Sequence, residues 1–580
     1  MSITGIRWAG PRALLVELTD LGSVLALHAR LLAEPLPGQL DAVAAAATVL
    51  LKFASAADTR GARNAVGHLD LTETSRDGGR EVIIEVVYDG EDLAEVGRLT
   101  GLGTDGVVAA HCGQTWTAAF GGFAPGFTYL AGEDRRLDVP RRSSPRTAVP
   151  AGSVALGGEF AAVYPRQSPG GWQLIGHTTA AMWDLSRESP ALVRPGDRVK
   201  YVAVRDSIEL SANVMSQSAA PSVAPAEVSA PETQSDGAEL QGGHLLVDTP
   251  GLQSLIQDLG RPGLGDLGVS ASGAADQRSA RQANRLVGNG STAAVVENVL
   301  GGLVLRARGD QVLAVTGALV PLTITTSTSA RRPSLCAPFA LLDGETLTLG
   351  APTAGLRSYV AVRGGVDVPP ILGSRSSDSM SGIGPAPLKT GMLLPVGPVP
   401  TYQLVGSPET STLQLGKDAA RLRVTLGPRD DWFHGHALET LSGQDWLVTE
   451  QSNRIGLRLA PVSPAGEKEG GRVLERRRDG ELPSEGAVAG SLQVPPNGEP
   501  VLFLADHPVT GGYPVIAVVV PEDLPVAAQL PPDQRVRFTV VDPETLAPIA
   551  TPFSHTSFTA PLNPAAVAVG PVHVPEGSYT

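Results

Sequence analysis

Cysteine is almost absent from this chain of 580 residues, which contains only Cys112 and Cys336. The two lie far apart in the sequence, so free buried thiols are expected rather than a disulfide, as in a reducing compartment. Basic residues are also in the minority, since 45 Lys and Arg stand against 59 Asp and Glu and give a net charge of −14. Binding to nucleic acid requires a basic face that neutralises phosphates. We therefore expect no nucleic-acid partner.

Long apolar runs are missing as well. None reaches the roughly 18 residues that a membrane-spanning helix needs. The first residues, MSITGIRWAGPR, lack the charged start, apolar core and cleavage site of a secretory signal. These absences predict a cytoplasmic protein that makes no membrane contact.

Several signatures of catalysis and cofactor binding are missing too. The only Gly-Lys pair, at 416–417, has no glycine five residues before it and no Ser or Thr after it, which excludes a phosphate-binding Walker loop. Two Gly-x-Gly-x-x-Gly matches, at 101–106 and 263–268, do not join a strand to a helix, so we expect no dinucleotide site. The chain also lacks the Ser-Ser-Lys pattern of amidases and the Met-Lys-Met site that carries biotin.

A metal site is not expected either. His434 and His436 would share one face of a strand, as two metal ligands do, but no third ligand stands nearby in the sequence. Structural and catalytic zinc sites need at least three protein ligands. A surface loop is therefore the preferred interpretation of this pair, and we predict no metal ligands.

Glycine and proline, in contrast, are abundant, with 67 and 48 residues. Clear long helices are scarce, and this combination favours short strands joined by many turns. Residues 151–201 and 489–538 carry the same three landmarks in the same order: Ala-Gly-Ser, then Gly-Gly before an aromatic residue, then a basic and apolar alternation. A repeat of this length indicates a duplicated domain. Glycine pairs permit a close backbone approach, so we predict two β-barrels, each with a glycine-opened mouth.

One stretch of the chain is typical of a linker. Residues 211–243 are rich in Ala, Pro, Ser and Gln and contain too few bulky apolar groups to offset the entropy of ordering. The fold is expected to be mainly β, with a small α+β domain at the N-terminus. We divide the chain into the α+β domain (1–78), a β-barrel (79–208), a flexible linker (209–243), two further β-barrels (244–402 and 403–555) and a tail (556–580).

The front half gathers aromatic and polar groups in short strings. In GGFAPGFTYL (121–130) the aromatic residues surround a Pro-Gly turn and would present their rings on one face, with a packed hairpin corner as the alternative. Further along, an arginine, hydroxyls, amides and an open glycine backbone suit recognition of an amide or carboxylate. For His111 a satisfied core histidine is the alternative. The substrate-binding candidates of the front half are His111, Phe123, Phe127, Tyr129, Arg146, Ser153, Ser168, Gly170, Gly171, Trp172 and Gln173.

The back half has polar constellations of its own. Residues 257–263 place an amide, a carboxylate and a guanidinium in one Pro-Gly turn, for which a structural salt bridge between Asp258 and Arg261 is the alternative. Other charged groups lie close to the second copy of the repeat, so the two glycine mouths could line one cleft. The catalytic candidates are Asp258, Glu485 and Asp506, and the substrate-binding candidates are Gln257, Arg261, Asn453, Arg454, Thr510, Gly511, Gly512 and Tyr513.

Long strings of the chain resemble a known family. GGFAPGFTYL, VPAGSVALGGEFAAVYPRQSPGGWQLIG and RPGDRVKY are similar to the B subunit of bacterial ATP-dependent 5-oxoprolinase, also known as the Kip-type kinase inhibitor or the first subunit of allophanate hydrolase. PGLQSLIQDLGRPGLGDLGVSASGAADQRSARQANRLVGN, SYVAVRGGVDVPPILGSRSSD and SEGAVAGSLQVPPNGEPVLFLADHPVTGGYPVI resemble the C subunit of the same enzyme. Both modules are also similar to the carboxyltransferase region of urea carboxylase.

The resemblance implies cyclophilin-like β-barrels and a fused B–C component that opens the lactam of 5-oxoproline to glutamate. It also implies ATP and Mg²⁺ as cofactors, a separate third subunit as a required partner, and a small amide or lactam as substrate. In that reaction Arg146 and Arg261 would clamp the substrate, and the three carboxylates would act as acid, base or metal-holding groups.

The alternatives are a carboxyltransferase acting on urea or allophanate with a biotin-carrying partner, and a regulator of a sensor histidine kinase. Association of the chain with copies of itself also stays open.

Overall fold

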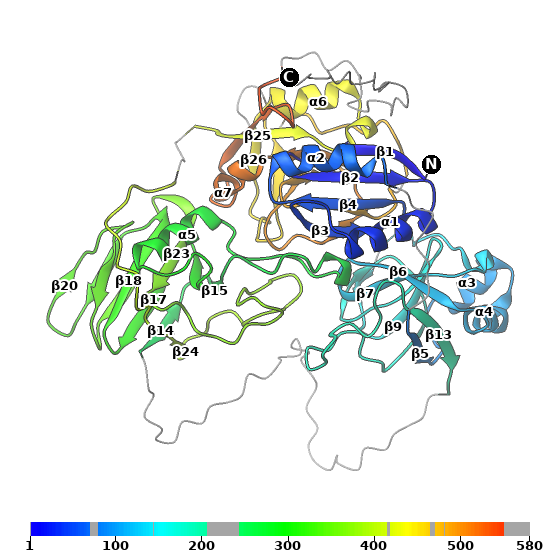
Figure 1. Cartoon of the computed structure of the whole chain (residues 1–580), viewed down its shortest axis with the longest axis horizontal. Coiled ribbons are helices and arrows are strands. Elements are labelled where there is room, and N and C mark those ends of the chain that lie inside the picture. Colours follow the sequence, from blue (N-terminus) through cyan, green and yellow to red (C-terminus); the bar gives the residue numbers. More distant parts are fainter. Residues whose placement is uncertain are drawn as a thin grey trace, which may run out of the picture.

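The computed structural model describes residues 2–69, 79–142, 144, 146–205, 243–413, 418–463, 470–480 and 482–549. The predicted linker, apart from Gly243, and the predicted tail lie outside the described residues. The chain builds sheets in four successive regions (Figure 1). The prediction of a mainly β protein with a small α+β unit at the N-terminus is confirmed. In the described part of the chain, no helix is long and apolar enough to span a membrane, and both cysteines are free.

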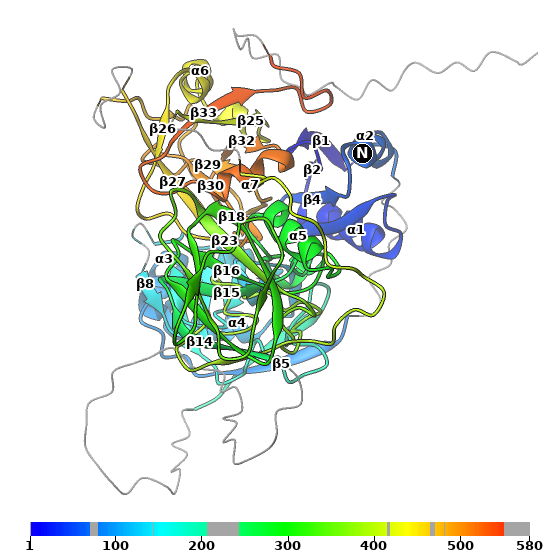
Figure 2. The ribbon, with the colours of Figure 1, turned by 90° about the vertical axis from the view of Figure 1, so that its left-hand side faces the viewer.

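The N-terminal region is a four-stranded antiparallel sheet in the order β1-β2-β4-β3, with two helices on one face. The strands β2 and β4 are apolar at most positions, so both faces of the sheet are buried there. Leu15 and Leu50 face Val509 of the last region, and Figure 2 shows this sheet beside that region. The elements are β1 (Ile3–Trp8), β2 (Ala13–Leu18), α1 (Leu21–Ala33), β3 (Gln39–Ala44), β4 (Thr48–Phe53) and α2 (Ala56–Val66).

The second region, the front barrel, is a seven-stranded sheet in the order β12-β9-β10-β7-β6-β13-β5. A bridge between Val87 and His177 brings its two ends together. A two-stranded ribbon, β8–β11, lies beside the sheet. The elements are β5 (Glu81–Val86), α3 (Leu93–Thr100), α4 (Gly103–Cys112), β6 (Trp116–Gly122), β7 (Ala124–Ala131), η1 (Arg135–Leu137), β8 (Arg146–Val149), β9 (Ser153–Gly157), β10 (Phe160–Val163), β11 (Ser168–Gly170), β12 (Gln173–His177) and β13 (Arg198–Ala203).

The third region, the middle barrel, has a six-stranded and a five-stranded sheet around one apolar core. Its helix α5 is capped by Asp276, whose carboxylate accepts from the backbone N–H of Ser279. The elements are β14 (His244–Pro250), β15 (Gln253–Gln257), η2 (Gly265–Leu267), α5 (Gln277–Leu286), β16 (Val295–Val299), β17 (Leu303–Arg308), β18 (Gln311–Leu319), β19 (Leu322–Thr325), β20 (Ala330–Arg331), β21 (Phe339–Leu341), β22 (Thr346–Leu349), β23 (Ala354–Val362) and β24 (Leu393–Pro395).

The fourth region, the last barrel, closes in the order β25-β32-β29-β30-β27-β26-β33. It carries its own two-stranded ribbon, β28–β31. The elements are β25 (Ala420–Leu426), η3 (Asp430–Trp432), α6 (Gly435–Gly443), β26 (Trp446–Val448), β27 (Gly456–Pro461), β28 (Glu485–Gly486), β29 (Ser491–Gln493), β30 (Val501–Phe503), β31 (Thr510–Gly511), β32 (Val515–Val519), η4 (Pro521–Asp523), α7 (Leu524–Ala527) and β33 (Arg535–Val540).

The repeated strings of the sequence occupy matching places in the front and last barrels. In each barrel the final strand runs parallel to the first, β13 with β5 and β33 with β25. Ser153 and Ser491 each begin the strand that pairs with the one after the Gly-Gly step. Each Gly-Gly step begins at the end of a ribbon, at Gly170 and Gly511. Matching registers therefore relate the two barrels position by position.

A long excursion of the middle barrel joins the two halves. Residues 258–273, which we call the arm, leave β15 and reach the front half (Figure 1). There η2 packs against β3, β6 and β7. A Cβ on Gly121 would overlap the carbonyl of Asp266, and Gly268 has φ +73° close to the carbonyls of Ala124 and Gly122. Glycines on both sides thus permit backbone-to-backbone packing, and the arm holds the halves together without the linker.

Candidate functional site

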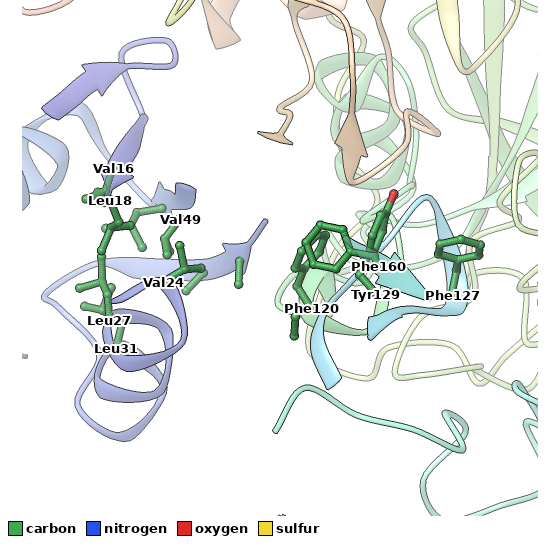
Figure 3. Close-up of a cluster of buried hydrophobic side chains, with 14 of the residues drawn as sticks. Val16, Leu18, Val24, Leu27, Leu31, Val49, Phe120, Phe127, Tyr129 and Phe160 are labelled. Atoms are coloured by element: carbon green, nitrogen blue, oxygen red, sulfur yellow. The ribbon is translucent and has the colours of Figure 1, made fainter. Parts of the chain in front are cut away.

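An aromatic wall lines the side of the front barrel that faces the arm and the last barrel. Its rings meet mostly edge to face, with centroids 5.1 Å apart for Phe123 and Phe127 and 5.2 Å apart for Phe127 and Tyr129. Trp172 completes the contact at 5.6 Å from Phe127. Figure 3 shows Phe120, Phe127, Tyr129 and Phe160 as a group separate from the aliphatic side chains of the N-terminal sheet and α1. Of these rings only that of Phe123 is partly exposed, and the others are buried in the apolar core, as in the packed hairpin corner that was the alternative.

The last barrel touches this wall directly. The N–H of Phe123, a residue with φ +59°, donates to Thr510 Oγ1 at 3.1 Å. The hydroxyl of Tyr129 lies 3.4 Å from Ser484 Oγ, and burial raises the pKa of Tyr129. A non-glycine residue with positive φ is strained and needs support from its surroundings. Thr510, a predicted substrate-binding residue, therefore holds the strained turn.

The first glycine of each Gly-Gly step has no room for a side chain. A Cβ on Gly170 would overlap the buried Tyr164 ring, and one on Gly511 would overlap the amide of Gln493. Gly512 has no positive φ, and its Cβ would meet only Leu482 O at 3.5 Å. The carbonyl of Gly171 accepts from the N–H of Arg142 at 2.7 Å. A side chain at Gly512 would therefore meet no steric conflict with the described residues.

Arg146 and Glu485 occupy matching positions, because Arg146 pairs with Gly170 and Glu485 with Gly511 in the two ribbons. Arg146 binds Asp92 with both terminal nitrogens at 2.9 Å, and this hydrogen bond raises the pKa of the guanidinium. Glu485 binds Arg429. Burial raises the pKa of Glu485, although Arg429 opposes the shift.

Asp92 and Arg429 match as well, since their N–H groups donate to the carbonyls of Leu174 and Val515, which occupy equivalent register positions. The two barrels therefore carry one ion pair with its charges exchanged. In both barrels the pair ties the ribbon to the loop after the first strand.

His111 lies in the core of the front barrel, 0% exposed. Its Nδ1 is 2.7 Å from the Tyr88 hydroxyl, and its ring lies 4.2 Å from that of Tyr201. Burial lowers the pKa of His111 to about 3, so the ring is neutral at physiological pH. The structure places His111 away from the aromatic wall, in agreement with the alternative of a core histidine.

Three further polar candidates of the front half are buried, and two of them donate to nearby backbone carbonyls. Ser153 is buried at the start of β9. Ser168 Oγ donates to Arg166 O at 3.4 Å, and Gln173 Nε2 donates to Pro140 O at 3.0 Å. Within the described part of the chain, Gln173 Oε1 is buried without a hydrogen-bond partner.

Asp506 and Arg454 form a fully buried ion pair where the last barrel meets the middle barrel. Arg454 donates to both oxygens of Asp506 at 2.9 Å and also contacts Glu297. Ser272 of the arm and Ser379 donate to the same carboxylate at 2.7 and 2.6 Å. Burial alone would raise the pKa of Asp506, but Arg454 and these serines hold it below its ordinary value. Asp506 is thus an ionised, fully bonded carboxylate that joins the two barrels.

Asp258 closes the base of the arm. Its oxygens accept from Ser374 Oγ at 2.6 Å and from the backbone N–H groups of Gly260 and Arg375 at 2.8 and 2.7 Å. The neighbouring Gln257 is 0% exposed, and its Nε2 donates to Ser377 O at 2.8 Å. Asp258 and Arg261 both bind the 374–377 loop. The salt bridge between them, which was the structural alternative, does not form within the described residues.

Two arginines have buried guanidinium nitrogens without hydrogen-bond partners in the region where the arm and the 374–378 loop meet the front and last barrels, which we call the junction. Arg261 is 2% exposed and donates only from Nη2, to Ser376 O. Among the described residues, its Nε and Nη1 have no partner, and neither does the buried Nε of Arg166. Burial lowers the pKa of both guanidinium groups, and the negative charge of Asp378 opposes this shift at both.

Arg166 and Asp378 were not among the predicted site residues. Both stand inside strings that carry the family resemblance, YPRQSPGG and SRSSD. No local pattern in either string shows that the fold brings them near Arg261, which belongs to a different segment.

The last two candidates lie outside the junction. Asn453 Oδ1 accepts from the N–H of Ile455 at 2.8 Å and so fixes the turn before β27. Tyr513 is 46% exposed, and the guanidinium of Arg476 lies 5.7 Å from its ring centroid.

The side chains that could bind a cofactor are charged groups. Over the described ranges, no three His, Cys, Asp or Glu side chains are placed to hold a metal ion. The rings of His434 and His436 stack at 5.2 Å, and His436 binds Glu475. Guanidinium groups bind carboxylates and phosphates, so Arg166 and Arg261, with nitrogens that lack described partners, are suited to an anionic ligand.

Comparison with known proteins places both halves in one family. The family model described as carboxyltransferase domain, subdomain C and D, matches residues 4–193, and that for subdomain A and B matches residues 267–540. The 5-oxoprolinase C subunit of Escherichia coli strain K12 is 36% identical over 294 residues, covering 50% of this chain and 88% of that protein. The chain belongs to the carboxyltransferase-domain family. The resemblance and the cyclophilin-like barrel class inferred from the sequence are confirmed.

Other relatives match one half or the whole chain. The 5-oxoprolinase B subunit of Escherichia coli O157:H7 is 46% identical over 132 residues, or 22% of this chain, and the match spans 61% of that protein. Urea amidolyase of Lachancea kluyveri is 30% identical over 51% of this chain but only 17% of its own length. A solved structure titled TTHA0988 superposes with a TM-score of 0.75 at 34% identity, covering 91% of this chain and 99% of that one. Fusion of the two modules therefore recurs in a known structure.

Proposed function

We propose that this chain is the fused B–C component of an ATP-dependent 5-oxoprolinase and that it opens 5-oxoproline to glutamate together with a separate third subunit. The observation that carries the proposal is the similarity of the front half to the B subunit and of the back half to the C subunit of that enzyme. The arm supports it, since η2 of the back half packs against β6 and β7 of the front half. The substrate site would lie where the two halves meet.

The chemistry of the lactam explains why a second component is needed. An amide carbonyl is a poor electrophile, and hydrolysis proceeds once its oxygen is activated, for which ATP supplies a phosphoryl group in this proposal. The residues of this chain would bind and orient the ring and exclude water. Phe123, the partly exposed ring of the aromatic wall, would offer apolar surface, and the arginines near the arm would offer positive charge to an anionic group.

The test uses the purified full-length chain. Alone, it should not form glutamate from 5-oxoproline, and addition of the third subunit with ATP and Mg²⁺ should start turnover. Glutamate formation and ATP consumption are measured together. Amide hydrolysis by the chain alone without ATP would refute the proposal, as would a complete mixture that forms no glutamate.

A second function is favoured by the family itself. The matched family models are carboxyltransferase domains, and urea amidolyase is among the relatives. Under this alternative, the chain would transfer a carboxyl group to urea or a related amide from biotin carried by another protein. Carboxylation of urea with a biotin-carrying partner, combined with no glutamate formation, would select this function instead.

A further inference from the structure

We infer that Arg166 and Arg261 form a carboxylate-binding subsite, so that the substrate of this protein is an amide carrying a carboxylate rather than a neutral amide such as urea. The inference rests on the proposed function for the location of the substrate and adds the chemical group by which it is recognised. The two residues come from opposite halves of the chain, one from the loop after β10 and the other from the arm.

The first argument is the unmet bonding capacity of Arg261. This side chain is nearly removed from solvent, being 2% exposed, yet only its Nη2 donates to a described residue, Ser376. Arg166 has a buried Nε with no partner in the described ranges. A buried guanidinium is tolerated when its N–H groups are bonded and its charge is compensated. A bound anion would supply both.

The second argument is the state of Asp378, the carboxylate whose charge acts on both arginines. Asp378 influences both arginines electrostatically, but its oxygens already accept from the N–H groups of Met380 and Ser381 and from the Ser381 hydroxyl. Its own charge is also disfavoured by burial and by Asp506. Asp378 therefore keeps the site from excessive positive charge without occupying the N–H groups of either arginine.

The third argument comes from other buried arginines of the same molecule. Arg454 is saturated by Asp506 and Glu297, and Arg429 is saturated by Glu17 and Glu485. Arg357, which is also buried, lacks a hydrogen-bond partner only at Nε, whereas Arg261 lacks one at both Nε and Nη1. Among the described buried arginines, Arg261 therefore keeps the largest unused bonding capacity.

The fourth argument is the aromatic neighbourhood of Arg166. Two residues earlier, the buried ring of Tyr164 packs against Phe123, the partly exposed ring of the aromatic wall, with centroids 6.3 Å apart. A planar ring bearing a carboxylate matches an aromatic surface beside guanidinium groups, because arginine pairs with carboxylates in a planar, two-bond arrangement. 5-Oxoproline has this shape, whereas urea has no carboxylate.

The experiment compares ligands that differ only in the carboxylate. Binding of 5-oxoproline and of 2-pyrrolidinone, the same lactam without a carboxylate, is measured by calorimetry with the full chain and with the complex containing the third subunit. Arg166→Gln and Arg261→Gln should each weaken 5-oxoproline binding at least tenfold and leave 2-pyrrolidinone binding unchanged. Arg308→Gln, a change at an exposed arginine of β17, should alter neither.

Thermal unfolding separates recognition from folding. Because both arginines keep buried guanidinium nitrogens without a described partner, their replacement by glutamine should leave the midpoint unchanged or raise it. Unchanged 5-oxoproline affinity in both variants would overturn the inference, as would a lowered midpoint with unchanged affinity. Loss of inorganic phosphate binding with intact 5-oxoproline binding would assign the arginines to a phosphate and also overturn it. No measurable 5-oxoproline binding to either the chain or the complex would do the same.

The proposed function is judged separately, by turnover. Glutamate formation with unaltered carboxylate discrimination in the variants would reject the subsite and keep the function. Carboxylate-dependent binding without glutamate formation would keep the subsite and reject the function.

Discussion

In the front barrel the indole N–H of Trp116 donates to the carbonyl of His111 at 2.9 Å, and in the last barrel that of Trp446 donates to Leu441 at 3.0 Å. In both barrels an arginine lies over the aromatic residue that follows the glycine pair, Arg141 over Trp172 and Arg476 over Tyr513. The ion pair between ribbon and barrel is also present twice, with its charges exchanged. Features that occur at matching positions in both barrels serve the scaffold.

The barrels differ at the loop after their matching strands β10 and β30. This loop of the last barrel contributes Asp506, which accepts bonds from an arginine and two serines. The loop of the front barrel contributes Arg166, whose buried Nε has no partner in the described part of the chain. In the last barrel the carboxylate of this loop is thus paired within the protein. In the front barrel the guanidinium of this loop keeps a nitrogen without a described partner. Ligand-binding residues are best sought among the positions that differ.

The largest effect is expected from breaking the buried ion pair between Arg454 and Asp506. Arg454→Ala would leave Asp506 and Glu297 buried without their counter-charge, and loss of one partner of a buried ion pair costs about 3–5 kcal/mol. The free energy of unfolding should fall by that amount in denaturant titrations followed by fluorescence. The matched change in the other barrel, Arg166→Ala, should cost far less. Equal losses of stability in the two variants would contradict the distinction between a fully paired arginine in the last barrel and a partly unpaired one in the front barrel.

The sequence allowed the scaffold to be predicted much further than the site. The α+β domain predicted for residues 1–78 contains α1 and α2 beside its four-stranded sheet, and the two Gly-Gly steps indicated the duplication. These signals are local, since each is carried by a few consecutive residues. The junction is not local, because it assembles Arg166, Arg261 and Asp378 from three separate segments.

Residue type alone also did not distinguish charged side chains that are paired within the protein from those that are free to bind a ligand. Arg146 and Glu485 were predicted as site residues from their type and neighbourhood. The structure pairs each with a partner of opposite charge that follows the first strand of its barrel, Asp92 or Arg429. Their roles as substrate clamp and catalytic acid remain predictions, and a test of the duplicated ion pair bears on both.

The second prediction exchanges the charges of that ion pair. Arg146→Glu alone would place a third carboxylate beside Glu91 and Asp92 and should cost about 2 kcal/mol. Combination with Asp92→Arg recreates the arrangement of the last barrel and should recover about half of that loss, because Arg142, which also binds Asp92, loses its partner. Unfolding free energies of the two single variants and the double variant give the coupling.

The same double variant addresses the clamp hypothesis. If Arg146 serves only the scaffold, 5-oxoproline should bind the folded double variant as it binds the wild type. Restored stability with lost binding would show that Arg146 contacts the substrate. If the stability losses of the two single variants simply add in the double variant, so that no stability is recovered, the equivalence of the two ion pairs would be contradicted.

The smallest effect concerns His111, whose counterpart in the last barrel is Leu441. Burial lowers the pKa of His111 to about 3 in the folded protein, against about 6.5 in the unfolded chain. As the pH falls below about 6.5, the unfolded chain binds this proton first, so stability is lost by up to about 1.4 kcal/mol per pH unit. His507, whose pKa burial lowers to about 4, acts in the same direction.

His111→Leu should remove one of these two contributions, so stability should decline less steeply between pH 6 and pH 4.5 than in the wild type. Unfolding at pH 8, where both imidazoles are neutral, isolates the packing cost of the substitution, including the lost contact with the Tyr88 hydroxyl. Identical slopes of stability against pH in the variant and the wild type would contradict the prediction. They would mean that His111 binds its proton equally well in the folded and the unfolded chain, so that burial does not lower its pKa.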